Sequence, residues 1–473
     1  MFLPSSDSYS YFFSLPFHYF LFQVMRRCLL PYFHIPIWSS LTIAATIAAV
    51  VLATFAQTIF QKKTPSDKMA AKSLQNVVVV GGSYVGMRAA KELASILPAS
   101  HRVLLIEPHS HFNHLFVFPR FAIVPNHEHK AFVPYSTVFS SAPDPAHHQV
   151  VRARVASLHP NHVTLDREWQ GSRDLVFEYL VAATGTRLAA PGSMPSEDKL
   201  PSVRYLQSYQ QGIAKAQSVV VVGGGAVGVQ MACDLKEVYP DKNITLVHSR
   251  QQLMPVYHEG LSDLIKARFA TLGINLVAGS RAVVPPAGFP NGTGEPFHVS
   301  LQGDRSVLAD FAILATGQTP NNQFLRGLAS PETDSASPLP DTLVNPSNGF
   351  IRVRPTLQFR DARFSHLFAV GDIADSGAHK AARPGAVQAA IAAKNIAGLV
   401  AGRAPSETIV VAPAGIHLTL GLTRNVIFRN PDTAAGATEP FVNLKDDGQE
   451  DMGVEGFWER NGVAVASPKD YHL

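Results

Sequence analysis

The sequence predicts an α/β fold with two doubly wound parallel sheets and a smaller C-terminal domain. The main observation is an internal repeat, in which NVVVVGGSYVGMRAAKELA (76–94) resembles SVVVVGGGAVGVQMACDL (218–235). Each copy reads as a buried strand, a glycine-rich turn and a helix, and the next strand ends at Glu107 in the first copy and at His248 in the second. Uninterrupted valine runs are typical of parallel strands buried on both faces. The sequence therefore predicts two βαβ repeats, the first and the second repeat below.

Composition excludes several classes of protein. With 473 residues, 46% of them hydrophobic, the chain is long and apolar enough for two or three domains, and it is neither disordered nor fibrous. Lys and Arg total 40 against 36 Asp and Glu, without a dense basic run among aromatic residues, so we expect no specific nucleic-acid binding. The cysteines, Cys28 and Cys233, exclude a disulfide framework and any CxxC redox pair.

The N-terminal segment predicts a transmembrane helix that serves as an anchor. Residues 28–61 contain no Asp, Glu, Lys or Arg, and LTIAATIAAVVLATFAQTIF (41–60) supplies the ~20 residues that a helix needs to cross a bilayer core. Two arginines before this stretch and three lysines after it favour, by a small margin, a catalytic part on the cytosolic side of the mitochondrial outer membrane or another organelle. The alternatives are a cleaved targeting sequence, or a cytoplasmic protein whose translation starts at Met69.

The first glycine-rich turn has the features of a dinucleotide site. A turn of this kind, placed between a strand and a helix, lets a pyrophosphate lie against the free N–H groups of the helix N-terminus, as in Rossmann-like domains. Ser83 stands where a second glycine normally lets the backbone approach the phosphate. The acidic residue at the end of the next strand is expected to bind both hydroxyls of an adenosine ribose. The residues assigned to this nucleotide are Gly81, Gly82, Ser83, Gly86 and Glu107.

The second repeat has the unbroken fingerprint GGGAVG, with Gly223, Gly225 and Gly228, but its strand ends in His248-Ser249-Arg250 without a carboxylate. A glutamate there would repel a 2′-phosphate, whereas His248 and Arg250 supply hydrogen-bond donors and a positive charge. NADPH is therefore expected to be at least tolerated. The alternative is that Arg250 points into solvent, and the choice between NADH and NADPH stays open.

Later motifs complete a known pattern. Each repeat closes with an apolar strand and a Thr-Gly turn, Thr184-Gly185 and Thr316-Gly317, and HLFAVGD ends in Gly371-Asp372. This order resembles the FAD-dependent pyridine nucleotide oxidoreductases over residues 74 to about 400. The resemblance implies that the first fingerprint holds FAD, that the second holds NAD(P)H, and that Asp372 binds the ribitol chain of FAD. The alternative for Asp372 is a helix N-cap.

The same resemblance divides the chain into segments and places a helix beside the flavin. An alanine-rich helix is expected from about Ala386 to Val400, and backbone groups near Val387 and Gln388 are candidates to stabilise the negative charge of the reduced flavin. The alternative is a helix that only packs on the sheet. The expected segments are the anchor (1–73), the FAD-binding domain (74–195 and 336–405), the NAD(P)-binding domain (196–335) and a C-terminal interface domain (406–473).

Missing cysteines narrow the reaction. The segment HSHFNHLF (109–116) holds no sulfur, and Cys233 is expected to be a core residue, so the flavin lacks the cysteines that disulfide reductases and flavin peroxidases use. We expect no metal site at His109, His111 and His114, because no cysteine or carboxylate completes the spacing. Electrons are therefore expected to leave the flavin directly.

Within the family, the chain resembles the apoptosis-inducing-factor-like proteins, in the ferroptosis suppressor (mitochondrion-associated inducer of death) branch, which is related to type II NADH dehydrogenases. The strings GGSYVGMRAAKELA, GGGAVGVQMACDLKEVYP and ITLVHSR carry this resemblance. Gln230 departs from it, because relatives often have a glutamate there, and an internal hydrogen-bond partner is the alternative to a cofactor contact for this residue.

The resemblance implies an enzyme that passes electrons from NAD(P)H through FAD to a quinone at a membrane face. Residues 406–473 are then expected to control acceptor access or to mediate a homodimer. Two other functions stay open: a reductase of a soluble protein electron carrier, and a redox-sensing signalling protein in which nucleotide binding changes an interaction.

Overall fold

The computed structural model describes residues 74–329 and 339–473. The predicted transmembrane anchor in residues 1–73 lies outside this part of the chain, as do residues 330–338. Across the two described ranges, no helix is both long and apolar enough to cross a membrane. Residues from Leu74 onward belong to one unit.

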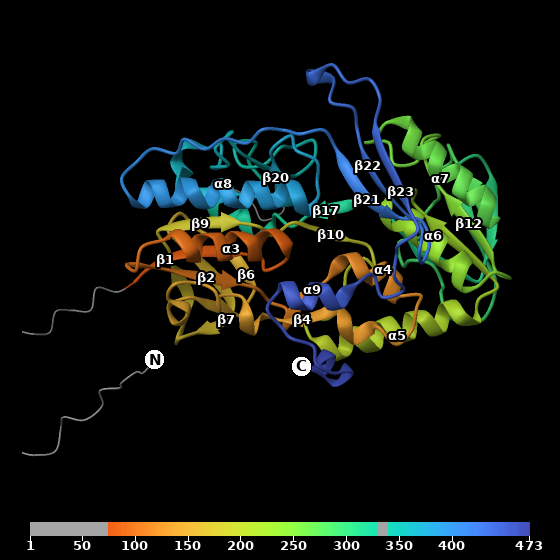
Figure 1. Ribbon diagram of the computed structural model, residues 1–473, viewed down its shortest axis with the longest axis horizontal. Coiled ribbons are helices and arrows are strands. Elements are labelled where there is room, and N and C mark those ends of the chain that lie inside the picture. Colours follow the sequence, from red (N-terminus) through yellow and green to blue (C-terminus); the bar gives the residue numbers. More distant parts are fainter. Residues whose placement is uncertain (1–73, 330–338) are drawn as a thin grey trace, which may run out of the picture. The chain divides into compact units, whose positions relative to one another are not determined.

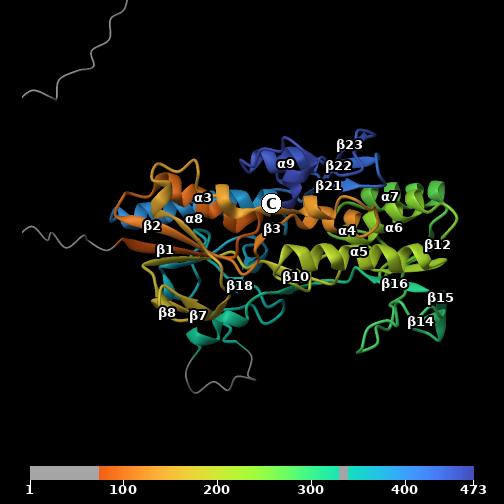
Figure 2. The same ribbon diagram turned by 90° about the horizontal axis from the view of Figure 1, so that it is seen from below.

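The first sheet is parallel, with the strand order β19-β9-β1-β2-β5. Alternate valines of β1 pack on opposite faces of the sheet. Val77 and Val79 belong to the hydrophobic core on the side of helices α3 and α8, whereas Val78 and Val80 belong to the core on the other side. Helices α3 and α8 cover one face, and the antiparallel sheet β6-β7-β8 covers the other (Figure 2). The bounds are β1 (Gln75–Val80), α3 (Tyr84–Ile96), β2 (His101–Ile106), β5 (Gln149–Val151), β6 (Val155–Leu158), β7 (His162–Trp169), β8 (Ser172–Val176), β9 (Tyr179–Ala182), β19 (Leu367–Ala369) and α8 (Ala382–Val400).

The second sheet is also parallel, with the order β13-β12-β11-β16. Helices α5, α6 and α7 lie on one side of it, and the hairpin β14-β15 lies on the other (Figure 2). The two βαβ repeats predicted from the sequence are therefore confirmed. The bounds are α5 (Lys199–Lys215), β11 (Ser218–Val222), α6 (Ala226–Val238), β12 (Asn243–Val247), α7 (Glu259–Leu272), β13 (Asn275–Val277), β14 (Phe297–Leu301), β15 (Arg305–Ala309) and β16 (Phe311–Leu314).

The C-terminal residues form a three-stranded antiparallel sheet, β21-β22-β23, and the short helix α9 (Figure 1). Trp458 of α9 is fully buried, and its indole N–H donates to the backbone oxygen of Lys130 at 2.8 Å. The bounds are β21 (Gly415–Thr419), β22 (Asn425–Arg429), β23 (Phe441–Lys445) and α9 (Val454–Arg460).

Short elements connect these parts. The antiparallel pair β10-β17 follows the Thr-Gly turns and links the ends of the two repeats. The antiparallel pair β3-β4 and the one-turn helix α4, which lies between these strands in the sequence, belong to the segment after Glu107. The bounds are β3 (His111–Asn113), α4 (Phe118–Phe121), β4 (Phe132–Pro134), β10 (Thr186–Leu188), β17 (Gln318–Pro320), β18 (Ile351–Arg352) and β20 (Ala374–Asp375).

Candidate functional site

The first glycine-rich turn joins β1 to α3, and its backbone explains two of its glycines. Gly81 has a φ of +98°, and a Cβ there would lie 2.7 Å from the backbone oxygen of Ala183. A Cβ on Gly86 would lie 1.7 Å from the oxygen of Gly81, a contact that real atoms do not make. Ser83, the N-cap of α3, has a φ of −77° that any residue adopts. The serine therefore causes no backbone strain.

Glu107 is buried directly after β2 and contacts this turn. Its Oε2 accepts from the N–H of Gly82 at 2.6 Å, and its Oε1 accepts from the N–H of His109 at 2.9 Å and contacts the imidazole of His109. Burial alone would raise the pKa of Glu107, but the hydrogen bonds and the charge of His109 hold this pKa below its ordinary value. Glu107 is therefore an anion, and the lone pairs left on its oxygens suit the two hydroxyls of a ribose.

The second turn repeats the geometry of the first. Gly223 has a φ of +123°, and its Cβ would lie 2.2 Å from the oxygen of Ala315. A Cβ on Gly228 would lie 1.9 Å from the oxygen of Gly223. A Cβ on Gly225, the N-cap of α6, would meet no atom within 4 Å, and no side chain caps this helix. The uncapped N–H groups of α6 and the open space beside Gly225 fit a pyrophosphate.

His248 lies at the end of β12, in the position that Glu107 has in the first repeat. The N–H of Gly224 donates to its Nδ1 at 3.0 Å, while its Nε2 is buried without a hydrogen-bond partner. Burial is the main cause that lowers the pKa of His248, and the charge of Arg250 lowers it further. Arg250 itself is exposed.

Asp372 follows β19 and lies half-buried in the turn 371–373, whose N-cap is Val370. Burial raises the pKa of Asp372, and Lys380 lowers it. The N-cap of α8 is Ala381, so Asp372 does not cap that helix and the capping alternative is wrong. The preceding N–H, that of Gly371, donates to Oε1 of Gln388 at 2.7 Å.

The sheet brings the residues predicted for the first nucleotide to one edge. Strands β2, β1, β9 and β19 are neighbours and run parallel, so their C-terminal ends lie together. Gly81, Glu107, Thr184 and Asp372 each come within three residues of such an end. The arrangement is that of a ligand site at the carboxyl edge of a parallel sheet.

Helix α8 begins earlier than predicted. It starts at Ala382 rather than at about Ala386, because a proline in the first helical turn needs no N–H partner and Pro384 can therefore lie inside the helix. The N–H groups of Val387 and Gln388 consequently lie in the second turn, where the helix itself binds them. The N–H groups without a partner inside the helix belong to its first turn. The prediction that Val387 and Gln388 supply free N–H groups to the flavin is therefore wrong, and residues of the first turn replace them as candidates.

The Thr-Gly turns differ in their surroundings. Thr184 Oγ1 donates to the backbone oxygen of Asn321 at 2.8 Å, and the amide of Asn321 donates back to the oxygen of Thr184 at 2.9 Å. Gly185 has a φ of +58°. In the second repeat, Thr316 and Gly317 are exposed. These two hydrogen bonds connect the Thr-Gly turn of the first repeat to Asn321, which follows strand β17 after the second Thr-Gly turn.

The three histidines after β2 have separate contacts. His109 binds Glu107, whereas His114 Nδ1 lies 2.6 Å from the hydroxyl of Tyr84, and His111 belongs to β3. Across the described ranges, no group of three or more His, Cys, Asp or Glu side chains is arranged to hold a metal ion.

Sequence reasoning missed a buried ion pair. Arg120 and Asp234 are fully buried, and Arg120 Nε donates to Asp234 Oδ2 at 2.7 Å. Arg120 also donates to the backbone oxygen of Gly421 at 2.8 Å, so it joins α4, α6 and the C-terminal sheet. Burial raises the pKa of Asp234, and Arg120 lowers it. The available signal was an aspartate inside the apolar run MACDL.

Gln230 and Cys233 lie on α6, where Asp234 also lies. Gln230 is buried, hydrogen-bonds to Asp234 and contacts the sulfur of Met452 at 3.6 Å, so it has the internal partners that the sequence left open. Cys233 is fully buried, and burial raises the pKa of its thiol, as expected of a core residue.

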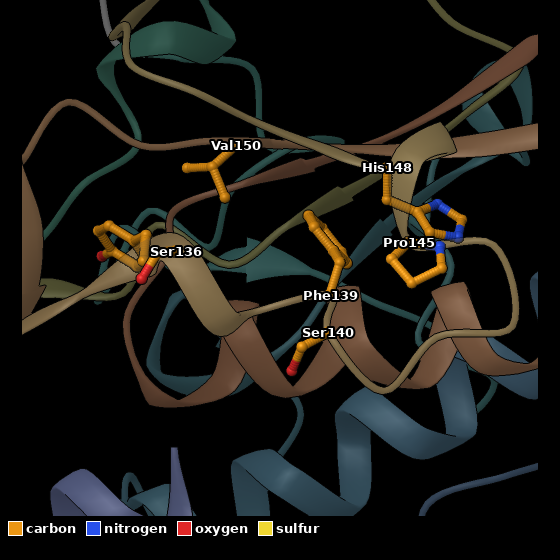
Figure 3. A pocket seen from close by; sticks show the side chains of 7 residues that line it. Ser136, Phe139, Ser140, Pro145, His148 and Val150 are labelled. Carbon is orange, nitrogen blue, oxygen red and sulfur yellow. The ribbon is translucent and has the colours of Figure 1, made fainter. Parts of the chain in front are cut away.

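A separate pocket lies at the edge of the first sheet (Figure 3). Its volume is about 370 Å³, and the hydroxyl of Tyr135, which lines it, donates to the backbone oxygen of Gly82 at 3.0 Å. It is lined by Tyr135, Ser136, Phe139, Ser140, Pro145, His148 and Val150.

Two dinucleotide turns on two parallel sheets, with an anionic residue at one and an imidazole at the other, define an oxidoreductase that binds two nucleotides. The chain belongs to the pyridine nucleotide-disulphide oxidoreductase family, whose model matches residues 75–393. Its cofactors are accordingly FAD and NAD(P)H.

Known proteins support this assignment. The chain is 32% identical to Fe-regulated protein 8 of Mycosarcoma maydis, over 83% of this chain and 96% of that protein. It is 26% identical to ferroptosis suppressor protein 1 of Xenopus laevis, covering 76% and 89%, and 26% identical to apoptosis-inducing factor homolog B of Dictyostelium discoideum, covering 74% and 87%. The sulfide:quinone oxidoreductase of Aquifex aeolicus shares the fold, with a TM-score of 0.63 at 19% identity over 83% of this chain and 93% of that one.

Proposed function

We propose that this protein oxidises NAD(P)H through bound FAD and passes the electrons to a quinone at a membrane surface. The observation that carries the proposal is the pair of glycine-rich turns. The two turns share the same backbone geometry, but the residue at the strand end is the carboxylate Glu107 in the first and the imidazole His248 in the second. One chain with two such turns binds a donor nucleotide and an acceptor nucleotide together.

The residues of the chain bind and orient the two cofactors. The N-termini of α3 and α6 bind the pyrophosphates, Glu107 holds the adenosine ribose of FAD, and Asp372 accepts hydrogen bonds from its ribitol chain. When bound, FAD supplies the chemistry, because it accepts a hydride from the nicotinamide and releases electrons to the acceptor. The bonds between Thr184 and Asn321 hold the closing turns of the two repeats in register for this transfer.

Relatives and thiol chemistry support a quinone as the acceptor. Cys233, the cysteine within the described ranges, is buried and its raised pKa keeps it a thiol, so it is not a relay for electrons. Cys28 lies outside those ranges. The chain is similar to ferroptosis suppressor protein 1 and shares the fold of a sulfide:quinone oxidoreductase.

Anaerobic spectroscopy of the full-length protein in detergent tests the proposal. We expect a flavin spectrum that NADH or NADPH bleaches and that a soluble quinone restores. A protein that binds no FAD, even after reconstitution, would contradict the enzyme. Bleaching that no quinone reverses would contradict a quinone as the acceptor, but not the oxidation of NAD(P)H by the flavin.

A redox-sensing signalling role is the second candidate, because the chain is also similar to apoptosis-inducing factor homolog B. This role predicts slow turnover with every quinone and a long-lived complex between the reduced flavoprotein and the oxidised nucleotide. Stopped-flow measurement of both half-reactions distinguishes the two, since an enzyme reoxidises faster with quinone than the nucleotide complex decays.

A further inference from the structure

A buried lysine holds residues 471–473 against the rest of the chain. Lys199, at the start of α5, is 5% exposed, and its ammonium donates to the backbone oxygens of Tyr471 at 2.6 Å, Leu473 at 2.7 Å and Phe132 at 3.3 Å. These three contacts use the three N–H groups of the ammonium. Burial lowers the pKa of Lys199 to about 8, and no aspartate or glutamate of the described residues contributes to this pKa. Below about pH 8, Lys199 is therefore a buried positive charge at this contact.

Two imidazole rings meet beside this lysine. The ring centroids of His129 and His472 are 3.9 Å apart, and Nδ1 of His129 is buried without a hydrogen-bond partner in the described part of the chain. Burial is the largest cause that lowers the pKa of His129, the charges of His472 and Lys199 lower it further, and the charge of Glu128 raises it. The contact therefore favours neutral rings, because a proton on one ring is opposed by the other ring and by Lys199.

The carboxylates around this contact already have partners, so they do not offset such a proton. They are Glu128, which accepts from Gln210 at 2.6 Å, Asp198, which pairs with Arg152, Asp451, which pairs with Lys130 at 2.9 Å, and Asp470, which accepts from the N–H groups of Ala466 and Ser467 at 2.8 Å. Glu455 and Glu459 are exposed and act on the ring of Tyr471. A further base, His111, lies with its Nε2 2.9 Å from the oxygen of Leu473 and adds positive charge when it is protonated.

We propose that residues 463–473 form a strap that is released at acidic pH, because protons on His129 and His472 add positive charge beside Lys199. A pKa of His129 below the ordinary 6.5 means that the released strap binds a proton more readily than the docked strap does. Docking is therefore complete above pH 6.5 and weakens as the pH falls below it. Lys199 keeps its charge throughout this range, because its pKa is about 8. Release of the strap is independent of the electron acceptor proposed above.

The strap is connected to the first nucleotide turn through α9. The ring of Trp458 in α9 has its centroid 5.5 Å from Nζ of Lys199. Its neighbour Phe457 stacks on His114, with the ring centroids 3.8 Å apart, and Nδ1 of His114 lies 2.6 Å from the hydroxyl of Tyr84 at the start of α3. Release at acidic pH is therefore expected to loosen α9 and to uncover aromatic rings beside the first turn.

Hydrogen–deuterium exchange of the FAD-loaded full-length protein in detergent measures the strap directly. Peptides that cover residues 463–473 are compared at about pH 7.5 and about pH 5.5, and their rates are corrected with the denaturant-unfolded protein at the same pH. We expect the corrected rate in the parent to rise roughly three-fold or more at the lower pH. His129→Asn combined with His472→Asn removes both titrating rings and is expected to abolish this rise. His298→Asn, which changes an exposed ring on β14, is the control and is expected to keep it.

Two results would overturn the strap: equal corrected exchange at both pH values in the parent, and an unchanged rise in the double variant. Lys199→Met removes the donor to Tyr471 and Leu473 and is expected to speed exchange at both pH values, so parent-like protection in this variant would contradict the anchor. Melting temperature and the flavin spectrum show whether each variant has folded. If the double variant does not fold, His472→Asn provides the same comparison, because His472 is exposed. Failure of the proposed electron transfer is seen separately, in the bleaching and recovery of the flavin.

Discussion

At the scale of single residues, the stability of the fold is expected to depend on the buried ion pair between Arg120 and Asp234. Both side chains are fully buried, and Arg120 Nε donates to Asp234 Oδ2 at 2.7 Å. Because an uncompensated buried charge is costly, Asp234→Asn or Asp234→Ala is expected to lower the free energy of unfolding by ~3–5 kcal/mol. Denaturant unfolding measures this change.

The exposed pair Arg424 and Asp446 provides the control, with side chains 38% and 63% exposed. Asp446→Asn is expected to cost less than ~1 kcal/mol, because solvent screens an exposed ion pair. Equal destabilisation by Asp234→Asn and Asp446→Asn would contradict the role given to the buried pair.

Glu107 is expected to determine how tightly FAD is held. Glu107→Ala removes the acceptor for the ribose and leaves the N–H of Gly82 unpaired, so FAD affinity is expected to fall roughly ten-fold or more. The measurement is FAD per chain after gel filtration. Glu168→Ala, on the exposed side of β7, is the control and is expected to keep its flavin. Full flavin occupancy in Glu107→Ala would show that the first turn binds FAD without this carboxylate.

His114 makes stability depend on pH. Burial, with a smaller effect of Arg460, lowers the pKa of His114 from 6.5 to about 3. A depressed pKa in the folded state gives stability that is present above pH 6.5 and is lost as the pH falls toward 3. We expect His114→Asn to flatten the difference in unfolding free energy across this window, measured by denaturant titration at several pH values. If the unfolding free energy of the variant changes with pH as it does in the parent protein, His114 is not the cause of this pH dependence.

At the scale of elements, the contact between α3 and α8 controls the shape of the flavin site. Gly385 of α8 lies against Val85 of α3, and a Cβ on Gly385 would approach a methyl of Val85 to 2.4 Å. Gly385→Ala is therefore expected to separate the helices, with a loss of ~1–3 kcal/mol in unfolding free energy and of bound FAD. Unfolding and flavin content are both measured.

Gly398 of the same helix is the matched control. A Cβ there would lie 3.9 Å from its nearest neighbour, an ordinary contact. Gly398→Ala is therefore expected to be neutral or to stabilise by up to ~1 kcal/mol, because alanine favours a helix. Destabilisation of the same size in both variants would contradict the packing argument.

Several helices and strands could be predicted from the local sequence alone. The valine runs and glycine-rich turns predicted β1, α3, β11 and α6, because strand burial and turn geometry depend on adjacent residues. The helix α8 starts at Ala382, about four residues before the predicted start at Ala386, because Pro384 is compatible with the first helical turn. The contact between Gly385 in the first turn of α8 and Val85 of α3 is a tertiary contact, which the local sequence does not show.

At the scale of the whole molecule, the N-terminal stretch and the catalytic unit are expected to act independently. Residues 74–473 form their own unit, and the apolar stretch 41–60 precedes them. A protein starting at Met69 is therefore expected to leave the membrane fraction and to keep flavin reduction by NAD(P)H. Fractionation and anaerobic spectra measure the two properties, and a truncated protein that stays with the membrane would contradict an anchor in the deleted segment.

The arrangement of the whole chain required contacts between distant residues. Strand β19 (Leu367–Ala369), which precedes Gly371-Asp372, pairs with β9 in the first sheet although all strands of the second sheet lie between them in the sequence. The order of motifs predicted this return only through the resemblance to a known family. Arg120 contacts Asp234, which is 114 residues later in the chain, and Gly421, which is 301 residues later, and no pattern in the sequence pairs them.

The sequence by itself determined the two nucleotide turns, because a tight turn, an open helix N-terminus and a buried strand each depend on residues a few positions apart. The tertiary structure decided which groups remain for a ligand. In the folded chain the carboxylate of Glu107 accepts from the N–H of Gly82, and Nδ1 of His248 accepts from the N–H of Gly224. Hydrogen bonds depend on distances of a few tenths of an ångström between segments that only folding brings together, so residue type alone cannot show which donors and acceptors are free.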